Sequence, residues 1–151
     1  MTLFRAAVSA IIINSNNEIL LVSKNGISDW QTVTGWVEDE TIDKAIIREI
    51  KEELEIEDIQ LLDIIDTHTF QYNDKKIIST FYLVKYNSGN IVPSDDINNY
   101  KYKWFTHDEV KSINIICPTQ VEIIDKAIYC INQYDHDKNK KYSFYKYKWQ
   151  K

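Results

Sequence analysis

The stretch WQTVTGWVEDETIDKAIIREIKEELEIE, residues Trp30–Glu57, joins a short β-like run to a strongly acidic helical pattern. The pattern predicts a helix from about Glu40 to Leu54. At about 3.6 residues per turn, Glu49, Glu52 and Glu53 fall on one face of that helix, within about 100° of arc. Like charges three and four residues apart weaken a helix by a few tenths of a kcal/mol per pair, so this face must lie against water or a cation.

The other faces of this helix have separate expected roles. The aliphatic side chains share an adjacent face and should pack on the core: Ile46, Ile47, Ile50 and Leu54. Lys44, Lys51 and Glu55 should point to solvent. Arg48 borders the acidic face one turn before Glu52, where its guanidinium group can hold that carboxylate in place.

The acidic face has the chemistry of a divalent-cation site. Mg²⁺ and Mn²⁺ prefer hard oxygen ligands that leave room for water and phosphate oxygens. An isolated EIKEE run is most often a solvated acidic face. Here Gly35, Glu40 and Arg48 precede the cluster at set distances, and this context favours a site for Mg²⁺ or Mn²⁺.

The rest of the chain reads mainly as strands with a helix at the end. Six segments have strand-like composition: residues 4–14, 19–24, 30–38, 59–72, 75–86 and 100–105. Thr106 with Glu109, and Thr119 with Glu122, fit the capping box that starts a helix. This order predicts an α+β fold, an α/β/α sandwich with a mixed central sheet flanked by helices.

Length and composition are those of a single soluble globular domain. The chain has 151 residues, of which 44% are hydrophobic and 27% charged. No apolar run is long enough to span a membrane, the first residues lack the pattern of a signal peptide, and the two cysteines form no disulfide framework. These features predict a cytoplasmic protein.

The net charge of −5 is unevenly distributed. The last fourteen residues carry six lysines and no acidic residue, so the first 137 residues carry a net charge of −11. An acidic body argues against non-specific binding to nucleic acid. We expect one domain at residues 1–137 and a basic aromatic tail at residues 138–151 that packs on this domain or extends it.

The residues around the acidic helix resemble the box of the Nudix hydrolase family. That box reads Gly, five residues, Glu, seven residues, Arg-Glu, an aliphatic residue, any residue, Glu-Glu, any residue, Gly, an aliphatic residue. The matching positions are Gly35, Glu40, Arg48, Glu49, Ile50, Glu52, Glu53 and Ile56. Two positions depart from it. Only four residues separate Gly35 from Glu40, and Glu55 replaces the late glycine, which normally takes the left-handed conformation.

The resemblance implies a metal-dependent hydrolase of a nucleoside diphosphate linked to another group. Glu49, Glu52 and Glu53 would bind Mg²⁺ or Mn²⁺, with the Gly35 carbonyl as a further ligand. The metal would neutralise the diphosphate and lower the pKa of a bound water. A box glutamate such as Glu52, held by Arg48, or a carboxylate from another loop would take the proton.

The run WQTVTGWVE is also similar to that of the bacterial dihydroneopterin triphosphate pyrophosphohydrolases, also described as dATP pyrophosphohydrolases. This resemblance implies that Trp30 and Gln31 contact a base or pterin ring and that Glu38 belongs to the substrate site. A tryptophan at a strand start is more often part of the core. That group also has a loop glutamate where this chain has Asn98, so Asp96, or its neighbour Asp95, is the candidate to replace it.

The predicted activity is cleavage of a nucleoside or pterin triphosphate to the monophosphate and pyrophosphate. A nucleotide sugar, a dinucleotide polyphosphate or a capped RNA end is an alternative substrate. A Nudix-like module that senses a nucleotide without cleaving it is the alternative from another class. The intact Arg48-Glu49-x-x-Glu52-Glu53 pattern favours the enzyme. A homodimer is the assembly that the resemblance suggests.

Overall fold

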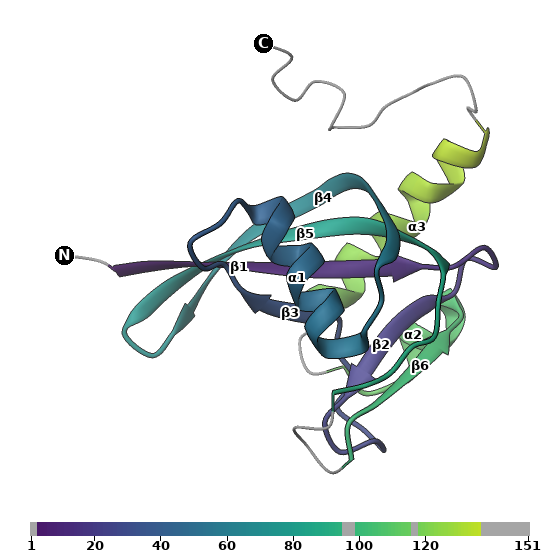
Figure 1. The fold of residues 1–151 in the computed structure, drawn as a ribbon, viewed down its shortest axis with the longest axis horizontal. Coiled ribbons are helices and arrows are strands. Elements are labelled where there is room, and N and C mark those ends of the chain that lie inside the picture. Colours follow the sequence, from purple (N-terminus) through teal and green to yellow (C-terminus); the bar gives the residue numbers. More distant parts are fainter. Residues whose placement is uncertain (1–2, 95–98, 116–117, 137–151) are drawn as a thin grey trace.

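The computed structural model describes residues 3–94, 99–115 and 118–136. In this part of the chain, strands and helices follow one another as the sequence predicts (Figure 1). The elements, in chain order, are β1 (Leu3–Ile13), β2 (Ile19–Ser23), β3 (Val33–Trp36), α1 (Ile42–Leu54), β4 (Asp58–Tyr72), β5 (Lys75–Ser88), β6 (Lys101–Phe105), α2 (His107–Ser112) and α3 (Pro118–His136).

The strands form one mixed sheet in the order β4-β5-β1-β2-β6, with β3 also paired to β1. β1 and β5 run parallel, whereas the other pairs of neighbouring strands are antiparallel. β1 and β2 form a hairpin, and β4 and β5 form another that turns at Asn73-Asp74. One edge of β1 is shared, because residues 12–13 pair with β2 and residues 7–10 pair with β3.

Helices cover both faces of the sheet, so the predicted α/β/α sandwich is confirmed. Side chains of β1 alternate between the two faces, as the period of a strand requires. Val8, Ala10 and Ile12 pack toward α1 in one core cluster, whereas Ile11 and Ile13 pack toward α3 in the other. Figure 1 shows α1 and α3 on opposite sides of the sheet.

Helix α1 buries one face and starts later than the sequence suggests. Its buried residues are Ala45, Ile46, Ile50 and Leu54. Ile47 is 44% exposed, so its predicted burial is wrong. Ala45 is buried against the sheet instead. The N-cap is Thr41, whose hydroxyl accepts a hydrogen bond from the Lys44 backbone N–H at 3.4 Å. Glu40 therefore precedes the helix, and its side chain is free to reach Arg48.

The end of α1 has the conformation that the box glycine would supply. Glu55 adopts φ 56° and ψ 25°, which is left-handed, and its backbone N–H donates to the Lys51 carbonyl at 2.9 Å. The helix therefore ends as in the family pattern although the residue carries a β-carbon, at a cost of roughly 1 kcal/mol.

The two predicted capping boxes have different outcomes. The box of Thr106 and Glu109 is present at the start of α2, with both of its hydrogen bonds formed. The prediction that Thr119 and Glu122 form a capping box is wrong, because α3 begins at Pro118 and Thr119 already lies within the helix. Proline suits the first helical position, since its missing N–H would have no partner there.

The two remaining predictions concern membrane-spanning segments and the basic tail. None of the helices in the described ranges is long and apolar enough to cross a membrane. The basic tail at residues 138–151 lies outside the described residues.

Candidate active site

Arg48 is the centre of the polar network on α1. Its Nε donates to both carboxylate oxygens of Glu40, at 3.0 and 3.1 Å, and its Nη2 donates to Glu40 Oε1 at 2.5 Å. Nη2 also donates to the Trp36 carbonyl at 2.9 Å. Nη1 donates to Glu49 Oε1 at 2.8 Å and to Glu52 Oε2 at 3.2 Å. The predicted contact with Glu52 is thus present, but Glu40 is the main partner.

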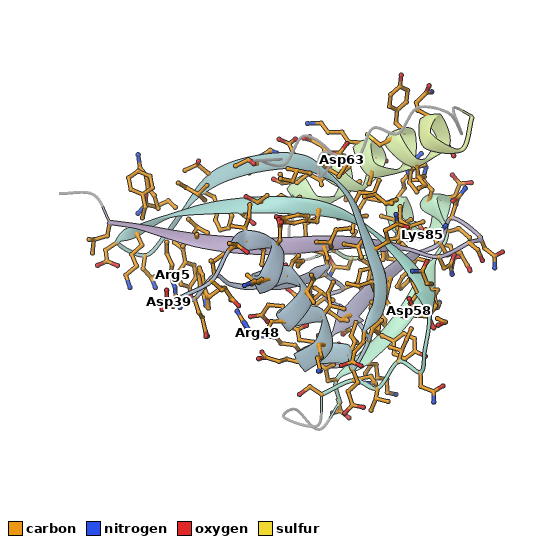
Figure 2. The ribbon with its side chains drawn as sticks, turned by 45° about the horizontal axis from the view of Figure 1, so that its top comes forward. Arg5, Asp39, Arg48, Asp58, Asp63 and Lys85 are labelled. Atoms are coloured by element: carbon orange, nitrogen blue, oxygen red, sulfur yellow. The ribbon has the colours of Figure 1, made fainter. Side chains whose placement is uncertain are left out.

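Arg48 and Glu40 each stabilise the charged form of the other. The hydrogen bond from Arg48 lowers the pKa of Glu40 below its usual value, and the carboxylate of Glu40 in turn raises the pKa of Arg48. The guanidinium of Arg48 bonds three carboxylates and a carbonyl at once, more acceptors than the three N–H groups of an ammonium could each serve. Arg48 therefore joins the loop before α1 to the acidic face of the helix; Figure 2 shows it projecting from α1 on the side where Asp39 also lies.

Glu49 lies directly against Gly35 of β3. A β-carbon added to Gly35 would stand 1.9 Å from Glu49 Cδ and 2.3 Å from each carboxylate oxygen, so no other residue fits without displacing Glu49. Burial raises the pKa of Glu49, although the hydrogen bond from Arg48 opposes that change. The short loop after Gly35 thus still brings the box glycine to the acidic face.

Glu53 has a partner that the sequence did not reveal. The Tyr100 hydroxyl donates to Glu53 Oε2 at 2.6 Å, across 47 positions in the chain. Burial raises the pKa of Glu53, and the negative charge of Glu49 raises it further. The only sequence signal for this role is position, since Tyr100 directly follows the long loop after β5.

The carboxylates have the chemistry to bind a divalent cation, but in the described part of the chain they do not converge on one position. Within the described ranges, no group of three or more Asp, Glu, His or Cys side chains is close enough together to hold a metal ion. Glu52 is 59% exposed and is drawn to Arg48, whose Nη1 bridges it to Glu49. A guanidinium cation thus lies between two of the predicted ligands, which are hard oxygen donors of the kind that Mg²⁺ prefers.

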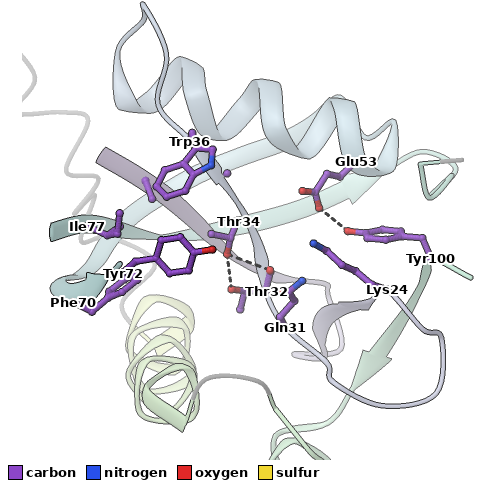
Figure 3. A pocket seen from close by; sticks show the side chains of 12 residues that line it. Lys24, Gln31, Thr32, Thr34, Trp36, Glu53, Phe70, Tyr72, Ile77 and Tyr100 are labelled. Carbon is purple, nitrogen blue, oxygen red and sulfur yellow. Dashed lines mark hydrogen bonds between the residues drawn. The ribbon is translucent and has the colours of Figure 1, made fainter. Parts of the chain in front are cut away.

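A cleft of about 410 Å³ opens beside this network (Figure 3). Its lining includes Gly35 and Glu53 of the box and Gln31, one of the predicted substrate-binding residues. Lys24 and Tyr100 lie at the same end as Glu53, and aromatic side chains of β3 and β4 lie at the other end. The cleft therefore connects predicted metal ligands to a surface that can hold an organic group.

Two other predicted substrate residues lie outside the lining of this cleft. Trp30 is buried in the core on the α3 side, with its ring edge-on to Phe105 at a centroid distance of 5.0 Å. The core reading of Trp30 therefore agrees with the structure. Glu38 is exposed in the loop before α1, where its backbone N–H donates to Glu40 Oε1 at 3.4 Å.

Asp96 and Asp95 lie outside the described residues. The residues on either side of that segment contact Glu53. The Ser94 backbone N–H donates to the Glu53 carbonyl at 2.8 Å, and Tyr100 bonds the Glu53 carboxylate. The loop is therefore anchored at both ends to the last turn of the acidic helix.

Comparison with known families identifies the domain. The sequence model described as "NUDIX domain" matches residues 3–126. The chain belongs to the Nudix hydrolase family. The match covers the six described strands, α1 and α2, and so includes the acidic helix with Arg48, Glu49, Glu52 and Glu53 that resembles the Nudix box. No relative was found among curated proteins.

Solved structures share the Nudix fold at low sequence identity. The MutT protein from Methanosarcina mazei Go1 has a TM-score of 0.68 at 21% identity, over 92% of this chain and 98% of that protein. A Caenorhabditis elegans Ap4A hydrolase has a TM-score of 0.68 at 20% identity, over 85% and 98%. The Escherichia coli dihydroneopterin triphosphate pyrophosphohydrolase has a TM-score of 0.67 at 18% identity, over 85% and 99%. At these identities the likeness establishes the fold.

Proposed function

We propose that this protein is a Mg²⁺-dependent Nudix hydrolase that cleaves a nucleoside or pterin triphosphate to the monophosphate and pyrophosphate. The observation that carries the proposal is the joining of the Nudix box to the cleft. Arg48 holds the carboxylates of Glu40, Glu49 and Glu52 together, and Glu53 of the same helix lines the cleft. A domain that only senses nucleotides has no need of this full set.

The metal would be held by Glu49, Glu52 and Glu53, with the Gly35 carbonyl as a further ligand. When bound, Mg²⁺ or Mn²⁺ would neutralise the phosphates and lower the pKa of a coordinated water. The burial that raises the pKa of Glu49 and Glu53 favours such a partner, because a cation compensates charge that water no longer solvates. Arg48 would then release Glu52 or orient it from the side.

Two residues are candidates for accepting the proton of the attacking water. Glu52 is the exposed member of the cluster and Arg48 fixes its position. Asp96 belongs to the segment whose neighbours, Ser94 and Tyr100, both bond Glu53. That anchoring supports a role for the loop carboxylate, since a general base must come within hydrogen-bond reach of the proton it takes.

Among the predicted substrate residues, Gln31 has the best support because it lines the cleft. The exposed Glu38 stays a prediction as a substrate contact. Trp30 is buried in the core and does not line the cleft, so it is not proposed to stack on a ligand there. The substrate subgroup, dihydroneopterin triphosphate or dATP, rests on the WQTVTGWVE run.

Residues 1–137 are proposed as the catalytic unit, with residues 138–151 as an extension of it. The matched Nudix region ends at residue 126, inside α3. A chain that ends at residue 137 should therefore keep its turnover number. Loss of activity on this truncation, with folding retained, would show that the tail belongs to the site.

One assay tests the proposed function. Release of pyrophosphate and phosphate, and formation of nucleotide and phosphate-ester products, are measured over a panel of nucleoside triphosphates, dihydroneopterin triphosphate, a nucleotide sugar, a dinucleotide polyphosphate and a capped RNA, with and without Mg²⁺. We expect Mg²⁺-dependent release of pyrophosphate from a triphosphate. Turnover of another compound instead would assign the alternative substrate class. Binding without turnover of any compound would assign a sensing module.

A further inference from the structure

An uncovered aromatic wall lies at the end of the cleft away from Glu53. Phe70 and Tyr72 are two residues apart on β4, so their side chains share a face of the strand. Phe70 pairs with Ile77 of β5, and both line the cleft with Tyr72 and Trp36. Figure 3 shows Trp36, Phe70, Tyr72 and Ile77 grouped together, opposite Glu53.

This wall is exposed although its residues are large and apolar. Tyr72 is 58% exposed and Phe70 is 49% exposed. Helix α3 packs on the same face of the sheet but lies against Ile11 and Ile13, at the other end of β1. In the part of the chain that the structure describes, no element covers Phe70 and Tyr72, and grouped exposed aromatic residues mark a binding surface more often than single ones do.

Trp36 connects the wall to the Nudix box. The guanidinium carbon of Arg5 lies 3.8 Å from the centroid of the Trp36 ring, a cation–π contact that fixes the indole plane. The Trp36 carbonyl accepts from Arg48 Nη2 at 2.9 Å. The ring wall and the acidic helix are therefore held at a fixed separation by one residue, beside Gly35.

The middle of the cleft is polar. Thr34 projects from β3 between the two ends, and its hydroxyl shares a network with those of Ser9, at 2.9 Å, and Thr32, at 3.4 Å. Gln31 offers an amide near Thr32 and Thr34, and Lys24 offers an ammonium group at the Glu53 end. In order along the cleft, the surface is aromatic, then hydroxyl and amide, then charged.

We infer that Trp36, Phe70 and Tyr72 form the subsite for the planar ring of the substrate, a nucleobase or a pterin, with its hydrogen-bonding edge toward Thr34 and Gln31. This inference deepens the proposed function and relies on it for the placement of the phosphates at Glu53. Stacking on aromatic side chains suits any flat ring, whereas the polar middle of the cleft selects among ring edges.

Uncharged ligands test the ring subsite without metal or hydrolysis. The ¹⁵N-labelled protein is titrated with deoxyadenosine, deoxyguanosine, deoxycytidine, thymidine and neopterin, and with ribose as the ligand that lacks a ring, and Kd values are taken from NMR shifts. We expect at least one ring ligand to bind saturably, with shifts of the Trp36 indole and Gln31 amide resonances. Ribose should cause none. The ligand that binds distinguishes a nucleobase from a pterin.

Variants assign the binding to the wall. Tyr72→Ala and Phe70→Ala should each weaken Kd for that ring ligand at least about fivefold, the lower range for aromatic stacking. Phe4→Ala is the matched control, because Phe4 is also 58% exposed but does not line the cleft. Its Kd should stay within twofold of wild type. All three side chains are at the surface, so the variants should remain folded.

Three results would overturn the inference. The first is that no ring ligand binds more tightly than ribose. The second is that Tyr72→Ala and Phe70→Ala both keep Kd within twofold of wild type. The third is that Phe4→Ala weakens Kd as much as they do. A lowered sedimentation coefficient in Tyr72→Ala with unchanged Kd would assign the wall to contact between copies. Ring binding by a protein that cleaves no triphosphate supports the subsite and contradicts the proposed hydrolysis instead.

Discussion

The carboxylate of Glu49 occupies the space that a side chain at Gly35 would need. A β-carbon there would lie 1.9 Å from Glu49 Cδ, closer than any non-bonded contact allows. Arg48 Nη1 also donates to that carboxylate, at 2.8 Å. The glycine of the Nudix box is therefore required for a close approach between β3 and α1 rather than for backbone flexibility.

Gly35→Ala should reduce turnover as strongly as loss of the Glu49 carboxylate, because the added methyl group must push that carboxylate out of place. We expect a fall of about two orders of magnitude, typical for loss of one group that stabilises developing charge. Steady-state kinetics with saturating Mg²⁺ measure it. Gly89→Ala is the control: at φ 113° the substitution strains the backbone, but the added β-carbon meets nothing within 4 Å, so it should lower stability and leave turnover unchanged. Equal effects of the two substitutions would refute the steric explanation.

Glu49→Gln and Glu53→Gln should each lower turnover about 100-fold or more while the protein stays folded. Burial raises the pKa of both groups, so their ionised forms are disfavoured in the metal-free protein. Removing the charge should therefore leave the free energy of unfolding unchanged or raise it. Urea unfolding without metal, beside kinetics with Mg²⁺, tests both parts. Variants that unfold would show that the cluster has a structural role.

Asp95→Asn and Asp96→Asn should separate the two candidate bases. Loss of a general base lowers the rate by about 10²–10⁴-fold. We expect a loss of this size for Asp96→Asn only, together with a changed pH–rate profile at saturating Mg²⁺. Near-normal rates in both variants would exclude the loop and leave Glu52 as the base.

Glu55→Gly should stabilise the protein by roughly 1 kcal/mol, because the left-handed conformation is strained for a residue with a β-carbon. Glu55 has φ 56° and an exposed side chain, so nothing else need change. Chemical denaturation of the metal-free protein measures the difference. Glu55→Ala keeps the β-carbon and should give no such gain. A gain of equal size in the alanine variant would point to charge rather than backbone strain.

The ion pair between β4 and α3 should make stability depend on acid pH. A hydrogen bond from Lys126 lowers the pKa of Asp66 from 3.8 to about 2. A carboxyl group whose pKa is lowered on folding stabilises the folded protein above pH 3.8. This stabilisation is lost as the pH falls toward 2. Asp66→Asn should therefore be less stable than wild type at pH 7, modestly so since Lys126 is largely exposed.

Urea unfolding from pH 7 down to pH 2 measures this difference. The two curves should converge as the pH approaches 2, because protonated Asp66 and asparagine are then both neutral. Lys126→Met should reproduce the effect from the other partner. A constant gap between wild type and Asp66→Asn at every pH would exclude the ion pair as its cause.

The sequence alone determined the elements and the chemistry of the box. Its strand segments, the α1 pattern and the Thr106 cap are read from neighbours within a few residues, and here the tertiary structure keeps them, whereas it overrides the equally local Thr119 signal. Glu55 replaces the glycine that normally takes the left-handed conformation after the box helix, and the structure shows that Glu55 adopts this conformation all the same. The face carrying Glu49, Glu52 and Glu53 follows from helical periodicity, so a metal site on it could be predicted before the fold was known.

Only the tertiary structure decided which distant residues meet at that face. Tyr100 bonds Glu53 across 47 positions, and the pairing of Ala7 with Trp36 helps to decide that Trp36, rather than Trp30, lies in the cleft. Glu40 reaches Arg48 because the helix starts after Thr41. These contacts depend on strand register and on which edge of β1 each partner takes, and a shift of one residue would turn every side chain to the opposite face.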